Sequence, residues 1–156
     1  MTEAASPRAI PIERIVSLHP FVVRRRIAFR DCDPAGIVYT PRFFDPIATS
    51  AVDLFMMEQI GPPGERDEGF DGLGFPAKAV SFVFHKGVRL GATVDIAVAP
   101  ANIGETSVTL DLKCHDAAGV LLFEASLTLV CIDSKTFIAT PTPDALRSKF
   151  RAYSSI

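Results

Sequence analysis

Two carboxylates separated by one residue, Asp31 and Asp33, are the side chains in this sequence best placed for chemistry. Pro34 and Gly36 follow them and predict a tight turn. The stretch contains no histidine, so its residues do not indicate a Ser-His-Asp or Cys-His arrangement. Cys32 lies between the two aspartates, whose charge disfavours its thiolate and makes it a poor nucleophile. On spacing alone, a turn-capping role for Asp33 is favoured, because an aspartate before proline commonly starts a turn.

A long helix is predicted directly after this turn. Thr40 is the predicted N-cap, with Pro41 at the first helical position, where the missing N–H costs nothing. Apolar residues then recur at helical spacing as far as Ile60, before a Gly-Pro-Pro sequence that stops the helix. Pro46 predicts either an irregular first turn or a kink. The turn would hold a carboxylate near the N–H groups and positive dipole end of a helix, which suits acyl transfer through an oxyanion.

The rest of the chain is predicted to supply the strands that position this helix. Residues 21–30 alternate with period two, except that Arg25 falls on the apolar face. The run of arginines here could bind phosphate, but a solvated strand face with cross-strand partners is the preferred interpretation. Four later segments are also predicted to be strands: residues 80–85, 93–98, 107–115 and 120–132. A short helix is predicted after them and ends near Ala152. This order predicts an α+β fold, with a five-stranded antiparallel sheet wrapped around one long central helix.

The stretch Asp31-Cys32-Asp33-Pro34-Ala35-Gly36-Ile37-Val38, followed by Pro41 and the aromatic pair Phe43 and Phe44, resembles a known motif. It is similar to that of the hotdog-fold acyl-CoA thioesterases, in particular the 4-hydroxybenzoyl-CoA thioesterase type. Over about residues 29–63 the resemblance extends to individual residues of the motif. Over residues 75–132 it is limited to the order of the predicted strands. It implies one hotdog domain over residues 21–156 that hydrolyses an acyl-CoA thioester, with an aromatic acyl group favoured.

The resemblance also implies roles for individual residues. Asp33 would attack the thioester or activate water, whereas the alternative is that it only caps the turn. The backbone N–H of Thr40 would donate to the thioester oxygen, and the backbone at Gly36 would lie close to the acyl group. Asp31 is expected to be a turn or ion-pair residue. The remaining expected substrate contacts come from the aromatic residues beside the turn and from a later Gly/Ser turn: Tyr39, Phe43, Phe44, Gly104 and Ser107.

The basic run that aryl-CoA thioesterases carry near Gly104 is absent from this sequence. Nucleotide contacts are instead expected from Lys86, Arg89 or the arginines of the first strand. The chain has 156 residues and a net charge of −2, which leaves no electrostatic footprint for nucleic acid. Its three scattered cysteines suggest neither a disulfide framework nor a metal site, and they fit a reducing cytoplasm. We expect no cofactor beyond CoA as part of the substrate.

Residues 1–20 contain no apolar run long enough for a signal peptide or membrane span, and we expect them to form a flexible tail. The open edge of a single sheet and the apolar strand at residues 120–132 predict a homo-oligomer, a tetramer built as a dimer of dimers. Two other functions are considered. A hotdog hydratase or dehydratase generally needs a paired histidine and acid, and the motif offers no histidine. The other alternative is a non-catalytic acyl-thioester binding module.

Overall fold

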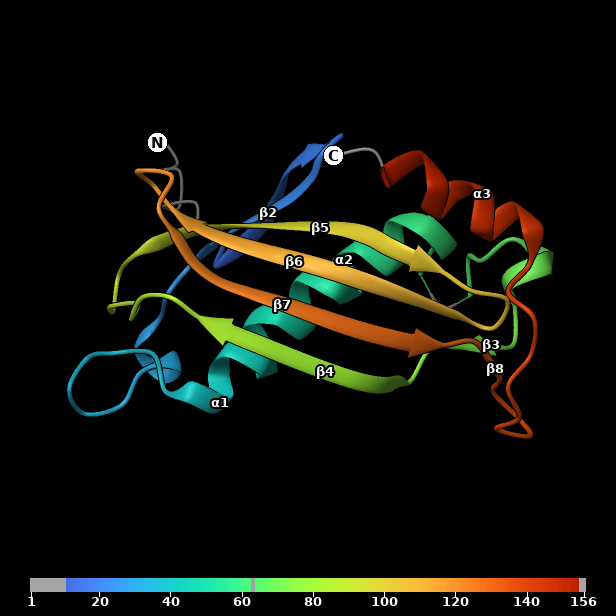
Figure 1. Cartoon of the computed structure of the whole chain (residues 1–156), viewed down its shortest axis with the longest axis horizontal. Helices are drawn as coiled ribbons and strands as arrows, with labels where there is room; N and C mark the ends of the chain where they lie inside the picture. Colours follow the sequence, from blue (N-terminus) through green and yellow to red (C-terminus); the bar gives the residue numbers. More distant parts are fainter. Residues whose placement is uncertain (1–10, 63, 155–156) are drawn as a thin grey trace, which may run out of the picture.

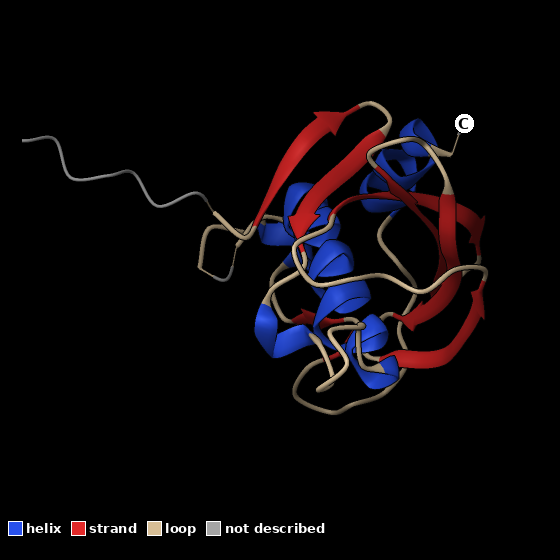
Figure 2. Ribbon diagram, turned by 90° about the vertical axis from the view of Figure 1, so that its left-hand side faces the viewer, coloured by secondary structure: helices blue, strands red, loops and turns tan. Residues whose placement is uncertain are grey.

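Six strands form one antiparallel sheet that curves around a single long helix, α2 (Figures 1 and 2). The computed structural model describes residues 11–62 and 64–154. The sheet order is β1-β2-β5-β6-β7-β4. The bounds are β1 Glu13–Leu18, β2 Phe21–Arg26, β4 Ala77–Phe84, β5 Thr93–Ile103, β6 Ser107–Asp116, β7 Leu121–Val130, α2 Thr49–Ile60 and α3 Asp144–Tyr153. The predicted antiparallel sheet around a central helix is confirmed.

The sixth strand, β1, lies in the segment that we expected to be a flexible tail. It pairs with β2, from Glu13 opposite Arg25 to Leu18 opposite Phe21. Ile15 packs against the hydrophobic core from this strand. Residues 1–10 of the expected tail lie outside the described residues. The prediction therefore differs from the structure at residues 13–18, because pairing with β2 orders a segment whose own pattern is weak.

The predicted helix at residues 41–60 is divided into a short α1 (Thr40–Arg42), a wider turn η2 (Phe43–Ala48) and α2. Asp45 leaves the helical conformation, with φ −122° and ψ 116°, immediately before Pro46. A residue before proline is sterically pushed towards the extended region, which explains the position of the break. The kink expected at Pro46 is present. No helix in the described residues is both long enough and apolar enough to span a lipid bilayer.

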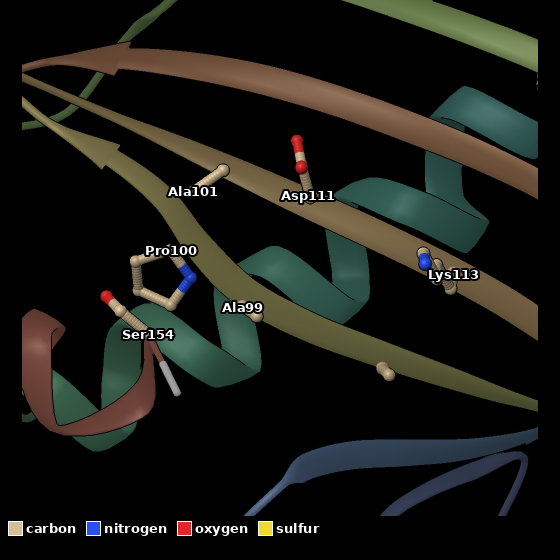
Figure 3. A pocket seen from close by; sticks show the side chains of 7 residues that line it. Ala99, Pro100, Ala101, Asp111, Lys113 and Ser154 are labelled. Atoms are coloured by element: carbon tan, nitrogen blue, oxygen red, sulfur yellow. The ribbon is translucent and has the colours of Figure 1, made fainter. Parts of the chain in front are cut away.

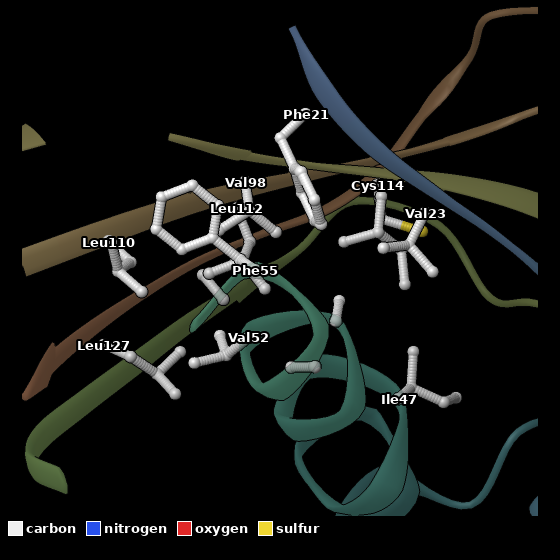
Figure 4. Close-up of a cluster of buried hydrophobic side chains, with 14 of the residues drawn as sticks. Phe21, Val23, Ile47, Val52, Phe55, Val98, Leu110, Leu112, Cys114 and Leu127 are labelled. Atoms are coloured by element: carbon white, nitrogen blue, oxygen red, sulfur yellow. The ribbon is translucent and has the colours of Figure 1, made fainter. Parts of the chain in front are cut away.

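The core lies between α2 and the concave face of the sheet (Figure 4). Val52 and Phe55 of α2 are buried against side chains of the central strands, and Phe55 meets Phe21 edge to face at 5.2 Å between ring centroids. Phe150 of α3 stacks on Phe55 at 6.3 Å and closes one end of the core. Burying each such side chain contributes about 1.5–3 kcal/mol. The helix is therefore held at a defined depth in the sheet.

One edge strand of the sheet, β4, is exposed along most of its length. Val80 is 47% exposed, Val83 56% and Phe84 47%. We predicted that the apolar segment at residues 120–132 would be a central or interface strand. Most of this segment forms β7, which is a central strand between β6 and β4. The uncovered apolar strand is therefore β4, because β7 has neighbours on both sides.

A second small sheet pairs β3 (Leu73–Gly74) with β8 (Ile132–Asp133). A 3₁₀ turn, Glu68–Phe70, precedes β3, and the Phe70 side chain is buried in the core. The ammonium group of Lys149 on α3 lies 5.3 Å from the centre of the Phe70 ring. This loop between α2 and β4 is thus anchored at its middle.

Candidate active site

The segment between Asp31 and Tyr39 is a narrow hydrogen-bonded hairpin. The Tyr39 N–H donates to the Asp31 carbonyl at 2.9 Å, and the Asp33 N–H donates to the Ile37 carbonyl at 2.9 Å. Gly36 has a φ of 75°, a left-handed conformation that favours glycine, and its N–H donates to the Asp33 carbonyl at 3.0 Å. The predicted turn is present, with Asp33 close to its tip.

The carboxylate of Asp33 uses one oxygen to stabilise this turn. Its Oδ1 accepts the N–H groups of Ala35 at 2.8 Å and Ile37 at 3.3 Å. Its Oδ2 has no hydrogen-bond partner among the described residues. The turn-capping role that was the alternative for Asp33 is thus observed, and one carboxylate oxygen is left over for a further role.

Asp31 is fully buried and forms an ion pair with Arg25, with Nη2 to Oδ1 at 3.3 Å. Its Oδ2 also accepts the N–H of Ala28 at 2.9 Å. The prediction that Asp31 is an ion-pair residue is confirmed. Burial raises the pKa of the Cys32 thiol, and the charges of Asp31 and Asp33 raise the pKa further. A raised thiol pKa agrees with the interpretation of Cys32 as a poor nucleophile.

The helix begins one residue earlier than predicted. Tyr39, with extended φ −66° and ψ 126°, is the N-cap, so Thr40 is the first helical residue and Pro41 the second. Among the residues that the structure describes, no side chain caps this helix start. Thr40 was expected at the cap because its hydroxyl suits that position, but the bond from the Tyr39 N–H to Asp31 fixes the cap at Tyr39.

The Thr40 N–H is the unpaired backbone donor of the turn. From Ala35 to Arg42, each backbone N–H donates to a protein acceptor within the described residues except that of Thr40, while Pro41 has no N–H. The first N–H groups of a helix have no partner inside the helix and carry its positive dipole end. This N–H is therefore available to an external acceptor.

Aromatic side chains from η2 and β4 gather beside the helix start. Phe43 is buried and lies 5.1 Å from Phe84 and 5.4 Å from Phe123, measured between ring centroids. Phe44 is partly exposed and meets Phe82 edge to face at 6.3 Å. Of the two phenylalanines expected to contact substrate, only Phe44 is on the surface.

Phe84 is a candidate site residue that the sequence analysis missed. It stacks on Phe82 at 5.6 Å, and nearly half of its surface is open to solvent. The period-two pattern placed both residues on one strand face, but it did not reveal that this face meets Phe43. Tyr39, also expected to contact substrate, is 55% exposed at the mouth of the hairpin.

Several cations surround the hairpin. The Val38 N–H donates to the Val88 carbonyl at 2.8 Å, and the Leu90 N–H donates to the Gly36 carbonyl at 2.9 Å, which places the segment after β4 beside the turn. Lys86 and Arg89 of this segment are exposed, as is Arg30 before the turn. The net charge of the chain is −2, so this group of positive side chains is a local feature of the hairpin end.

The arginines of β2 are divided between the two faces of the sheet. Arg24 is on the outer face and forms two hydrogen bonds of 2.8 Å to the carboxylate of Asp95 on β5. This contact agrees with the preferred interpretation of a solvated face with cross-strand partners. Arg25 lies on the inner face, as its place in the pattern predicted, and is only 2% exposed.

No protein-family model matches the chain. Its structure is similar to that of a thioesterase-superfamily protein from Jannaschia sp. CCS1, with a TM-score of 0.77 and 28% identity over 88% of this chain and 94% of the other. A gentisyl-coenzyme A thioesterase gives a TM-score of 0.70 and 25% identity over 83% and 98%. A 1,4-dihydroxy-2-naphthoyl-CoA thioesterase from Synechocystis gives 0.71 and 18% over 84% and 95%. The chain has the hotdog fold.

The hotdog fold predicted from the motif is thereby confirmed, with six strands in place of five. The structural neighbours are thioesterase-superfamily proteins. They do not single out the 4-hydroxybenzoyl-CoA type, which stays a prediction.

Within the single chain, Gly104 and Ser107 are far from Asp33. They form the turn between β5 and β6, where the Gly104 N–H donates to the Ser107 carbonyl at 2.8 Å. β5 begins opposite Arg26, near the hairpin, and runs for 11 residues to that turn, a length of roughly 35 Å. The structure therefore does not bring the two expected groups of substrate contacts together in a single chain.

Two surface hollows are candidates for binding, and neither contains Asp33 or Thr40. One of 280 Å³ lies on the outer face of the sheet, where Asp111 and Lys113 flank small side chains of β5 (Figure 3). The other, of 370 Å³, lies between α2 and the segment from β3 to Phe75 that leads into β4. It is mostly apolar, with lining residues that include Val52, Met56, Met57, Phe75 and Leu129. We refer to it as the α2 groove.

The α2 groove also holds one carboxylate, Asp53. Burial raises the pKa of Asp53, and the nearby charges of Glu13 and Asp45 raise the pKa further. No group of three potential metal ligands occurs among residues 11–62 and 64–154.

Proposed function

We propose that this protein hydrolyses an acyl-CoA thioester to the free acid and CoA. One observation carries the proposal: a single hairpin and the helix start after it present two groups that have no partner within residues 11–62 and 64–154. These are a carboxylate oxygen of Asp33 and the backbone N–H of Thr40. Thioester hydrolysis needs a nucleophile or base for the carbonyl carbon and a donor for its oxygen. The similarity to a gentisyl-coenzyme A thioesterase at 25% identity supports the same chemistry.

The reaction follows from these two groups. The thioester carbonyl oxygen accepts the Thr40 N–H, which stabilises the negative charge that develops on it. Asp33 either attacks the carbonyl carbon and forms an anhydride, which water then cleaves, or removes a proton from an attacking water. In both routes the C–S bond breaks, the CoA thiolate leaves and takes up a proton, and water supplies the acid oxygen.

The surroundings of the hairpin favour an aromatic acyl group on a CoA carrier. The exposed faces of Phe44 and Phe84 offer aromatic surface beside the helix start. Benzoyl and 4-hydroxybenzoyl groups are the acyl groups we propose first. Lys86, Arg89 and Arg30 are exposed around the hairpin and would meet the CoA phosphates. These local cations could bind the phosphates even though the net charge of the protein is −2.

We propose that the complete site forms between two subunits paired through β4. Two copies of one strand in antiparallel pairing place the end of each beside the start of the other. Phe84 ends β4 near the hairpin, whereas Phe75 of the α2 groove precedes the start of β4. The groove of one subunit would then lie beside the Asp33 hairpin of its partner. Ser107, which pairs with Val130 at the groove end, would approach that hairpin too.

A free-thiol assay with benzoyl-CoA tests the proposed reaction. We expect CoA release to require the protein and to show saturation kinetics, with benzoate as the second product. Stoichiometric binding of benzoyl-CoA without thiol release would instead assign a binding module. Hydration of an unsaturated acyl-CoA, again without thiol release, would assign a hydratase.

The oligomer can be tested at the middle of β4. We expect the protein to be a homo-oligomer, a tetramer made of two such dimers, because β4 leaves an apolar edge uncovered. Val80→Lys should yield monomers by light scattering and lose most activity, because two lysines would face each other near the two-fold axis. Val120→Lys, at a similarly exposed valine on the β6–β7 turn, is the control and should change neither. A fully active wild-type monomer at micromolar concentration would contradict the proposal.

We also predict that activity survives extended dialysis against EDTA. The proposed reaction uses only a carboxylate, a backbone N–H and water, and it requires no Lewis acid. Thiol release should be measured before and after dialysis, and again after zinc or magnesium is added. Loss of activity that either metal restores would overturn this prediction.

A further inference from the structure

A buried ion pair connects β2 to the hairpin. Arg25 is 2% exposed and Asp31 is 0% exposed, and Nη2 of Arg25 lies 3.3 and 3.4 Å from the two carboxylate oxygens. Replacing such a pair with apolar side chains of similar volume often leaves stability unchanged or raises it. Stability alone therefore does not account for two charges at this position.

Asp31 is bonded on both sides of the hairpin. Its carboxylate accepts the N–H of Ala28, before the turn, at 2.9 Å. Its carbonyl accepts the N–H of Tyr39, at the other end of the turn, at 2.9 Å. Tyr39 directly precedes Thr40, whose N–H is the proposed oxyanion donor. A displacement of Asp31 would therefore move the donor and, two residues away, the carboxylate of Asp33.

The ion pair extends to the N-terminal strand. Glu13 of β1 accepts a hydrogen bond from Nη1 of Arg25 at 3.2 Å, and it also accepts the hydroxyl of Ser50 on α2. Arg25 thus lies between two carboxylates, one from β1 and one from the hairpin, and β1 is tied to the central helix. Nε of Arg25 has no partner in the described part of the chain, so these contacts fix the orientation of the guanidinium group.

We propose that Arg25 and Asp31 are positioning residues for the hairpin, and that Glu13 holds Arg25 in place for this task. Strand β1 then contributes to the geometry of the site through Glu13, in addition to extending the sheet. The inference rests on the proposed function, in which Asp33 and Thr40 act on a thioester. It assigns no contact with substrate to Glu13, Arg25 or Asp31.

The double variant Arg25→Met/Asp31→Leu separates positioning from simple stability. It replaces both charges of the buried pair with apolar side chains, and the carboxylate that loses its partner, Glu13, has a side chain that is 27% exposed. We expect urea unfolding close to that of the wild type, but kcat lower by about 10- to 100-fold, because small displacements of reacting groups are costly. KM should change much less. A folded double variant with wild-type kcat would overturn the proposal.

The pair Arg24 and Asp95 provides a matched control. It joins the same strand to β5 on the opposite face, with hydrogen bonds of 2.8 Å. Arg24→Met/Asp95→Leu should leave kcat unchanged. If it lowered kcat as much as the buried double variant, the effect would come from the sheet in general, and the positioning role would be wrong.

A milder variant covers the case in which the double variant does not fold. Glu13→Gln keeps the shape and hydrogen-bonding capacity of the side chain but removes its charge. We expect a several-fold loss of kcat with an unchanged circular dichroism spectrum, and recovery of part of that loss in Glu13→Asp, which restores the charge. Wild-type kcat in folded Glu13→Gln would overturn the role of β1.

Amide hydrogen exchange at Tyr39 is a readout that does not depend on activity. Its N–H is bonded to Asp31, so loss of positioning should increase its exchange rate at least tenfold in the buried double variant and not in the control. Unchanged exchange would overturn the proposal. If the wild type released no thiol from acyl-CoA but Tyr39 exchange still depended on the ion pair, the proposed function would fail while the positioning role stood.

Discussion

Asp33→Asn is expected to lower kcat for thiol release by about 10²-fold or more, at the lower end of a general-base contribution. The structure indicates that this substitution would keep the hydrogen bonds of the turn. An asparagine Oδ1 can still accept the N–H groups of Ala35 and Ile37, which lie 2.8 and 3.3 Å from the present oxygen. The new amide replaces only Oδ2, which has no partner in the described residues. The turn should persist while the nucleophile or base is lost.

Steady-state kinetics with benzoyl-CoA and circular dichroism give the necessary measurements. Asp45→Asn is the matched control, because Asp45 is an exposed carboxylate at the same helix entry, and it should stay active. Asp31→Asn should cost less activity than Asp33→Asn but more stability. Breaking a buried ion pair typically costs about 3–5 kcal/mol. Equal kcat in folded Asp31→Asn and Asp33→Asn would show that Asp33 is assigned wrongly.

Thr40→Pro is expected to lower kcat by about 10²- to 10³-fold, the usual effect of losing one oxyanion donor. Proline removes the N–H and suits the first position of a helix. Tyr39 is already extended, with ψ 126°, as a residue before proline prefers. Because the Thr40 N–H has no acceptor in the described residues, the substitution should break no internal hydrogen bond. Both the fold and the carboxylate of Asp33 should remain in place.

Thr40→Ala is the control for the lost side chain. Tyr39 occupies the cap position, so the cost of about 1 kcal/mol for losing a capping hydroxyl is not expected here. Thr40→Ala should therefore stay active and folded. Equal kcat in folded Thr40→Ala and Thr40→Pro would place the oxyanion donor elsewhere. Tyr39 would be an unsuitable replacement, because its N–H already donates to Asp31.

The hairpin and its helix were predictable because short-range sterics decide them. Proline and glycine at positions 34 and 36 leave few conformations for the turn, and the left-handed φ of Gly36 agrees with that. The kink at Pro46 follows from the same local rule. The period-two pattern of four strands was also visible, and three of them, β2, β5 and β6, each bury one face. The α+β fold and the place of Asp33 on its turn therefore came from neighbouring residues alone.

The missed features depend on contacts between one segment and another. Strand β1 has a weak pattern and exists because it pairs with β2 and places Glu13 beside Arg25. Phe84 belongs to the site only because β4 packs its end against Phe43. Nothing local shows that Gly104 lies at the far end of the sheet from Asp33.

The contacts of β1, Phe84 and Gly104 depend on register and packing between segments. The residue pattern of one segment does not specify which other segment it packs against. The residues next to Asp33 are thus what make it the candidate carboxylate. The tertiary structure alone decides which partners the buried charges meet and which strand edge stays open.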